Sequence, residues 1–303
     1  MASAGLRATS TGTVYRRTVD TPHPGPLPPS STALRRTVLA VSVLDSVDLF
    51  PHDDCVTLVG NHPDLELSWA EISGALAGSD PDSDTARTRL RTWVRLRAGL
   101  ARLGDPTLYA RPVGLPPGHP LHPGPQWVQT RVPGEALDLG LGVLGLLDDP
   151  DEVVVVPPSL LRAAGVDISE WWPRQALELE RTGRLAAERL LRDGAAPLRP
   201  FGDLDVLTLL GSTAYRRALC EADPVGWRTA AVPMRTRGWL DLGRIDPAFA
   251  AAAALATEPD ERGFDRAVFV TPEEIVMVSS LGRSARHALE DPPAGVDPWL
   301  RGR

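Results

Sequence analysis

The sequence predicts an α+β protein in which a mixed or largely antiparallel sheet packs with several helices. Short β-branched segments and amphipathic helical segments are interspersed along the chain, without the regular alternation of a doubly wound parallel sheet. Several of the short segments are joined by turns, which is typical of hairpins. Hydrophobic residues make up 43% of the 303 residues, so we expect a core that needs neither disulfides nor metals.

We expect a folded region over residues 33–284, in one lobe or two, with disordered tails at both ends. The N-terminal tail, 1–32, includes TPHPGPLPPSS, in which five of eleven residues are proline. Such a composition buries too little apolar surface to offset the entropy of ordering. The C-terminal tail, 285–303, is polar and Pro-rich, and a Pro/Gly loop near 112–125 is the candidate division between the lobes.

The first elements of the folded region are predicted from β-branched runs and capping residues. Thr37–Asp45 is short and β-branched, which favours a buried strand, and Cys55–Gly60 predicts a second strand. Ser68 and Glu71 have the spacing of a capping box, which predicts a helix from about residue 69 to 78.

An arginine-rich helix is expected next, over RTRLRTWVRLRAGLAR, with Asp84 as a candidate cap. Its leucines and Trp93 form an apolar arc, which indicates a core face. The stretch holds six arginines, but the whole chain has a formal charge of -7. We therefore expect these arginines to be solvated or paired within the molecule, and we expect no nucleic-acid partner.

The remaining elements follow from periodicity and from Gly/Pro boundaries. A helix over about 173–192 has one apolar face, and Glu180–Arg184 and Glu188–Arg192 are expected as ion pairs on its outside. Strands are predicted in PTLYARPV, QWVQTRV, LDLGLGV (half-buried), EVVVVP and TAAVPM. Helices are predicted in PSLLRAAG, DLDVLTLLGSTAYRRALCEA and DPAFAAAAALAT, the last of which is capped by Asp246. A hairpin is predicted over AVFVT and EEIVMV.

Composition excludes several chemistries. All 32 basic residues are arginine, and a chain without lysine can form neither a Walker phosphate loop nor a Schiff base with pyridoxal phosphate. Cys55 and Cys220 are too isolated for a metal or redox motif and are expected to be free, buried thiols. We expect no cofactor. No G-x-S-x-G nucleophile elbow occurs.

Three motifs are weighed against structural interpretations. GLGVLG, 140–145, matches a dinucleotide-binding pattern by letter, but a turn follows where a helix is required, which favours a strand. His119 and His122 have H-x-x-H spacing inside a Pro-rich loop, where exposed histidines are expected rather than a metal site. His62 and Asp64, near His52, Asp53, Asp54 and Cys55, are interpreted as part of a turn.

The candidate ligand-binding site lies in VPMRTRGWLDLGR, where Arg235 and Arg237 precede Trp239 and Asp241. On one strand, two arginines at period two point to the same face and repel each other unless a negative group lies nearby. The negative group is either an internal carboxylate, for which Asp241 is nearest in sequence, or a bound anion.

These observations favour a non-enzymatic interaction or regulatory protein that binds a protein partner. The alternative is an enzyme or binding protein that acts on a small anionic ligand through Arg235 and Arg237. The longest apolar runs are too short to span a bilayer, and the N-terminus lacks the apolar core of a signal peptide. We therefore expect a soluble, cytoplasmic protein without a membrane partner.

Overall fold

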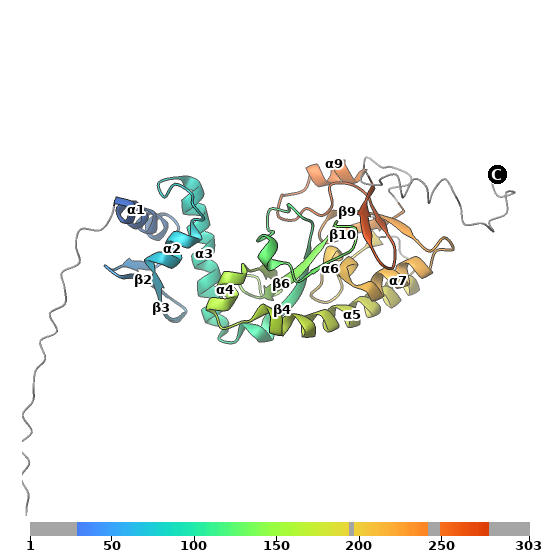
Figure 1. Ribbon diagram of the computed structural model, residues 1–303, viewed down its shortest axis with the longest axis horizontal. Coiled ribbons are helices and arrows are strands. Elements are labelled where there is room, and N and C mark those ends of the chain that lie inside the picture. Colours follow the sequence, from blue (N-terminus) through green and yellow to red (C-terminus); the bar gives the residue numbers. More distant parts are fainter. Residues whose placement is uncertain (1–28, 194–196, 242–248, 279–303) are drawn as a thin grey trace, which may run out of the picture.

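The computed structural model describes residues 29–193, 197–241 and 249–278, and these form an α+β fold with three antiparallel sheets. The elements before residue 80 lie on one side of the long helix α3 (Asp84–Leu103), and the later elements lie on its other side (Figure 1). Within the described residues, no helix combines the length and the apolar character needed to cross a membrane. The predicted tails fall outside these residues, except that helix α1 begins at Pro29.

The N-terminal unit, residues 29–80, packs two helices against a three-stranded sheet. Strand β2 (Cys55–Gly60) is central, and β1 (Leu49–Pro51) and β3 (His62–Ser68) pair with it on either side. Helix α2 (Trp69–Ala75) begins with the predicted capping box, in which Ser68 and Glu71 bond each other's backbone. The predicted domain division near 112–125 stays a prediction, although strand β4 (Ala110–Leu115) overlaps it and pairs with β6 (Asp138–Leu144).

The predicted strand over Thr37–Asp45 is wrong, because residues 37–44 belong to helix α1 (Pro29–Leu44) and Asp45 lies in the turn that follows it. The buried positions are Leu34, Thr37, Val38 and Val41, which have helical spacing, whereas Leu39 and Val43 are exposed. A strand would have buried alternate residues. The packing of one helical stripe on the sheet therefore overrides the β propensity of the valines.

Helix α3 is confirmed, with Ser83 rather than Asp84 as its N-cap. Its apolar side belongs to two clusters: Leu90 and Val94 pack with the N-terminal unit, and Leu96 and Leu100 pack with the central sheet. Trp93, which was expected in the core, is half-buried and contacts both clusters.

Each of the six arginines of α3 has an oxygen partner within the molecule. Arg87, Arg91, Arg95 and Arg97 lie within 4.0 Å of the carboxylates of Asp84, Asp45, Asp148 and Glu71. Arg89 donates to the Leu76 carbonyl and the Ser79 hydroxyl, and Arg102 donates to the carbonyls of residues 145–147. The arginine stretch is therefore an internally paired helix.

Strand β6 is the inner strand of the central sheet. It pairs with β4 along one edge and with β5 (Thr130–Arg131) and β7 (Val153–Val155) along the other. The strand is buried on both faces rather than half-buried. A Cβ at Gly140 would overlap the indole of Trp127, and one at Gly142 would meet Val113 and Val153. The glycines of GLGVLG therefore serve close packing within a strand.

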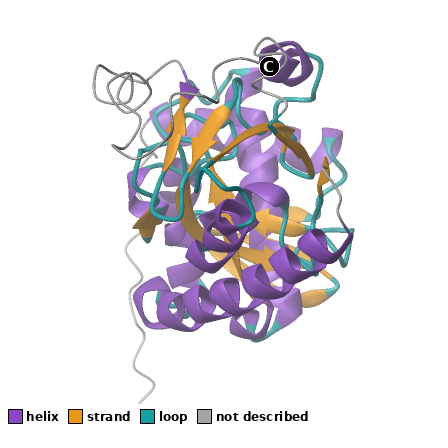
Figure 2. Cartoon of the chain, turned by 90° about the vertical axis from the view of Figure 1, so that its right-hand side faces the viewer, coloured by secondary structure: helices purple, strands orange, loops and turns teal. Residues whose placement is uncertain are grey.

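The C-terminal sheet has the strand order β12-β11-β9-β10-β8. Strand β9 (Arg228–Met234) lies between helix α9 (Phe249–Leu255) and the helices α5 (Ile168–Asp193) and α7 (Thr213–Glu221) (Figure 1). Figure 2 shows the molecule from its right-hand side, with helices packed around the strands. The closing hairpin is confirmed as β11–β12, and Asp246 falls outside the described residues. The remaining elements are β8 (Pro197–Leu198), β10 (Arg237–Leu240), β11 (Val268–Val270), β12 (Ile275–Met277), α4 (Pro158–Ala163), α6 (Val206–Gly211), and the 3-10 helices η1 (Pro106–Tyr109) and η2 (Pro125–Trp127).

Helix α5 starts five residues before Pro173 and packs along α7. The Glu180 carboxylate accepts hydrogen bonds from the Ser212 hydroxyl and from the backbone N–H groups of Thr213 and Ala214. The expected ion pair with Arg184 is therefore wrong, because Glu180 instead satisfies the free N–H groups at the start of α7. Gly183 allows the close approach, since a Cβ there would overlap Ser212.

The attachment of α3 to the central sheet predicts the effect of an added methyl group. A Cβ at Gly99 would overlap the carbonyl oxygen of Leu146, so we expect Gly99→Ala to lower the free energy of unfolding by about 2–3 kcal/mol. Gly74→Ala is the matched control, because nothing lies within 4 Å of a Cβ there, and a gain of about 0.5–1 kcal/mol is expected. Urea unfolding of both variants measures these changes, and equal effects would contradict the close contact.

Candidate functional site

The two arginines of the predicted ligand site lie on either side of a hairpin turn rather than on one strand. Arg235 follows the last residue of β9, and Arg237 is the first residue of β10. The expectation that both side chains share one strand face is therefore wrong. The tight turn between β9 and β10 sends the two side chains to different surroundings.

Arg235 has an internal carboxylate partner, as the electrostatic argument required, but the partner is Asp205 rather than Asp241. Its Nε and Nη2 atoms lie 2.9 and 2.8 Å from Asp205 Oδ2, and the two side chains are only 16% and 12% exposed. The other oxygen, Asp205 Oδ1, accepts from the Thr208 backbone N–H and caps helix α6. Asp205 therefore joins β9 to α6 through both of its oxygens.

The remaining residues of the predicted site face other partners. Asp241 Oδ2 lies 2.6 Å from Arg228 Nη2 on the neighbouring strand β9. The exposed guanidinium of Arg237 lies 6.0 Å from the ring centre of Trp239, and Trp239 packs edge-on against Phe249 of α9. The four residues therefore do not converge on one ligand position.

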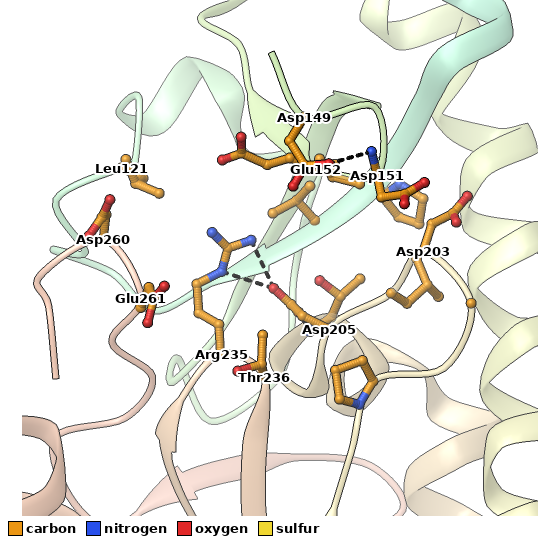
Figure 3. A pocket seen from close by; sticks show the side chains of 17 residues that line it. Leu121, Asp149, Asp151, Glu152, Asp203, Asp205, Arg235, Thr236, Asp260 and Glu261 are labelled. Carbon is orange, nitrogen blue, oxygen red and sulfur yellow. Dashed lines mark hydrogen bonds and ion pairs between the residues drawn. The ribbon is translucent and has the colours of Figure 1, made fainter. Parts of the chain in front are cut away.

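Arg235 lies at the base of a cavity of about 550 Å³ (Figure 3). The described residues that line this cavity carry seven carboxylates and one guanidinium, which is that of Arg235. Figure 3 shows Asp149, Glu152, Asp260 and Glu261 around the guanidinium, with Asp205 bonded to it. The surrounding charge opposes an anion here, and the Asp205 carboxylate already takes the place that an anion would occupy.

The expectation of exposed loop histidines is also wrong, because His119 is buried, the His122 side chain is only 10% exposed, and both imidazoles are hydrogen-bonded at both ring nitrogens. His119 Nδ1 accepts from the Leu121 N–H, so its Nε2–H donates to the Arg262 carbonyl. His122 Nδ1 accepts from the Gly124 N–H, and its Nε2 lies 3.3 Å from the buried carboxylate of Asp138. These bonds use both ring nitrogens to shape the loop, which leaves neither for a metal ion.

The interpretation of His62 and Asp64 as part of a turn is wrong, because both belong to strand β3, which begins at His62. His62 Nδ1 lies 2.8 Å from the Pro63 carbonyl, and His52 Nε2 lies 3.1 Å from the Thr57 hydroxyl. Over residues 29–193, 197–241 and 249–278, no three histidine, cysteine or acidic side chains come together as a metal site would require. Cys220 is buried, whereas Cys55 is half-buried rather than buried.

A feature that sequence reasoning missed is a groove of about 650 Å³ between α5, η1 and the loop before α6. Leu108, Leu177 and Leu185 line it and are 67%, 73% and 42% exposed. The signal was present in the sequence, because Leu177 and Leu185 lie off the apolar face that was predicted for α5. The lining is completed by Thr107, Arg111, Pro112, Arg174, Gln175, Glu178, Arg181, Thr182, Phe201, Gly202, Asp203 and Leu204.

Comparison with known proteins adds no assignment. No protein-family model matches the chain, and neither a curated protein nor a solved structure is significantly similar to it.

The Arg235–Asp205 pair predicts a stability effect without an anion effect. Arg235→Ala leaves a shielded carboxylate without its partner, so we expect the free energy of unfolding to fall by about 2 kcal/mol. Added phosphate should change the melting temperature of wild type and variant equally. Phosphate that stabilises only the wild type would contradict the internal pair and restore the anion site.

His119 predicts a pH effect whose sign follows from its burial. Burial lowers the pKa of His119 below its ordinary value, and the nearby Arg235 lowers it further. As the pH falls, His119 therefore takes up a proton in the unfolded chain before it does so in the folded protein. The contribution of neutral His119 to the free energy of unfolding is complete above about pH 6.5 and is lost as the pH falls through the folded-state pKa. We expect His119→Gln to lose less stability than wild type between pH 7 and pH 5 in urea unfolding. Identical pH profiles would contradict this.

Proposed function

We propose that the protein acts by binding a protein partner in the groove beside α5. The observation that carries this proposal is the exposure of Leu108, Leu177 and Leu185 around one concave surface. Exposed apolar groups that line a common groove are typical of interaction surfaces, whereas single exposed leucines are ordinary. Figure 1 shows α5 along one edge of the molecule, where a partner can approach it along its length.

The charges of the groove favour an amphipathic helix with an acidic side chain as the occupant. Arg111 pairs with Asp203 at 2.8 Å, and Arg181 pairs with Glu178 at 2.6 Å. Arg174 instead lies over the Trp171 ring at 5.6 Å, and no described carboxylate forms an ion pair with it. A partner helix that inserts apolar side chains between the leucines can therefore place a carboxylate beside Arg174.

The internal partners of the α3 arginines support the expectation that nucleic acid is not the partner. A basic side chain whose charge is neutralised within the molecule releases few counterions from a nucleic acid. With a cytoplasmic location, which stays part of the proposal, the partner would be another cytoplasmic protein.

The alternative of a small anionic ligand near β10 now depends on Arg237. Its guanidinium is exposed beside Trp239, and no described carboxylate pairs with it. An anion held there would contact one arginine and one indole, without the second arginine that the sequence suggested.

A photo-reactive residue at position 177 tests the groove directly. We expect irradiation of cells that express this variant to give a covalent adduct, with the cross-link mapped to an amphipathic acidic helix of the partner. Leu108→Asp and Arg174→Glu, each introduced into the photo-reactive variant, should weaken partner binding about tenfold, which corresponds to about 1.4 kcal/mol, and should lower the adduct yield accordingly.

Leu255→Asp is the matched control, because Leu255 is equally exposed but lies on α9, outside the groove. All three substitutions are at exposed positions and should change the free energy of unfolding by less than about 0.5 kcal/mol. An adduct that is insensitive to Leu108→Asp and Arg174→Glu, or no adduct at all, would refute the groove. An adduct of twice the chain mass would identify a second copy as the occupant instead.

A further inference from the structure

A second cavity, of about 300 Å³, lies between α5, α7 and the segment that follows β8. Its described lining comes from three places far apart in the sequence: Ala186, Arg189 and Leu190 on α5, Tyr215 on α7, and Pro197, Arg199, Pro200 and Phe201 around β8. It shares Phe201 with the α5 groove and has no lining residue in common with the acidic cavity except Pro200.

Tyr215 gives this cavity a hydrogen-bond donor without a partner in the described protein. Its side chain is 1% exposed, and its Cβ packs near Gly183 of α5. No described residue forms a hydrogen bond with its hydroxyl, although its backbone N–H donates to Ser212. The hydroxyl oxygen is not among the described side-chain atoms that are shut off from solvent without a partner, so it is reachable from the cavity, where a ligand oxygen can accept from it. Burial raises the pKa of Tyr215, which keeps the phenol protonated and able to donate.

The charge of the cavity is opposite to that of the acidic cavity beside Arg235. Arg189 and Arg199 line it, and no described residue of its lining carries a carboxylate. Arg199 is exposed, and no described carboxylate forms an ion pair with it. A guanidinium and a phenol hydroxyl at one cavity are both donors, and both match the oxygen atoms of an anion.

The walls set the size and the character of the ligand. Ala186, Leu190, Pro200 and Phe201 offer apolar surface beside the two donor groups. The volume is at the lower end of the range for small-molecule sites, which are about 300–1,000 Å³. A compact apolar body that carries one oxyanion fits both the walls and the donors.

We propose that this cavity binds a small organic oxyanion, whose oxygens accept from the Tyr215 hydroxyl and pair with the Arg199 guanidinium while its apolar body lies against Phe201. The shared chemistry is a carboxylate or a phosphate ester on a compact ring or branched chain. This site is separate from the proposed partner groove and does not depend on it.

Calorimetric titration with four probes tests the site: benzoate, phenyl phosphate, inorganic phosphate and neutral benzamide. We expect benzoate or phenyl phosphate to bind the full chain at one equivalent, with benzamide and inorganic phosphate at least tenfold weaker. The stronger of the two organic anions then shows whether the site favours a carboxylate or a phosphate ester.

Two substitutions remove one donor each and leave the fold unchanged. Tyr215→Phe keeps the ring and removes the unpaired hydroxyl, and Arg199→Gln removes an exposed charge; each should weaken the organic anion about tenfold. Arg184→Gln is the matched control, because Arg184 is an exposed arginine of α5 outside the cavity lining, and its affinity should equal that of wild type.

The proposal is overturned if neither organic anion binds at a concentration of ~10 mM, which reaches the weakest specific affinities. It is also overturned if neutral benzamide binds as tightly as the organic anions. Binding that Tyr215→Phe and Arg199→Gln both leave unchanged would overturn it as well. A melting curve of each variant, matched to wild type, shows that a loss of binding is not a loss of fold.

Discussion

Helix α3 is the element on which the arrangement of the molecule depends. Its first half completes the core of the N-terminal unit through Leu90 and Val94, and its second half packs on the central sheet through Leu96 and Leu100. Trp93 contacts both clusters at the point where they meet. Since one continuous helix belongs to two cores, the hydrogen bonds of its backbone hold the two cores in a fixed arrangement.

The pairing of polar and charged groups within the molecule decides which surfaces are left for function. Glu180 caps α7, Asp205 joins β9 to α6, and Asp138 accepts hydrogen bonds from Arg131 and His122, so these carboxylates serve the fold. Groups that are buried and satisfied in this way are poorly placed to bind a ligand. Function is proposed instead at the exposed leucines of the α5 groove and at the cavity lined by Tyr215 and Arg199, because no described residue pairs with the Tyr215 hydroxyl and no described carboxylate pairs with Arg199.

Local patterns predicted much of the fold, because capping and periodicity depend on neighbours in sequence. The capping box at Ser68, strand β2 and helix α3 all follow from such patterns. The segment 37–45 could not be assigned in this way, since valine-rich helices and buried strands look alike until the packing of α1 on the sheet is known. The candidate site failed for a related reason: Asp205 lies thirty residues before Arg235, and only the fold brings them together.

Native-state hydrogen exchange of the α3 amides tests the coupling of the two cores most directly. If α3 joins them, the amides of residues 90–94 and 96–100 open with the same free energy and respond equally to low concentrations of urea. A first half that opens together with the N-terminal unit, at a free energy lower by about 2 kcal/mol or more than the second half, would show that the two cores unfold separately and would contradict this account.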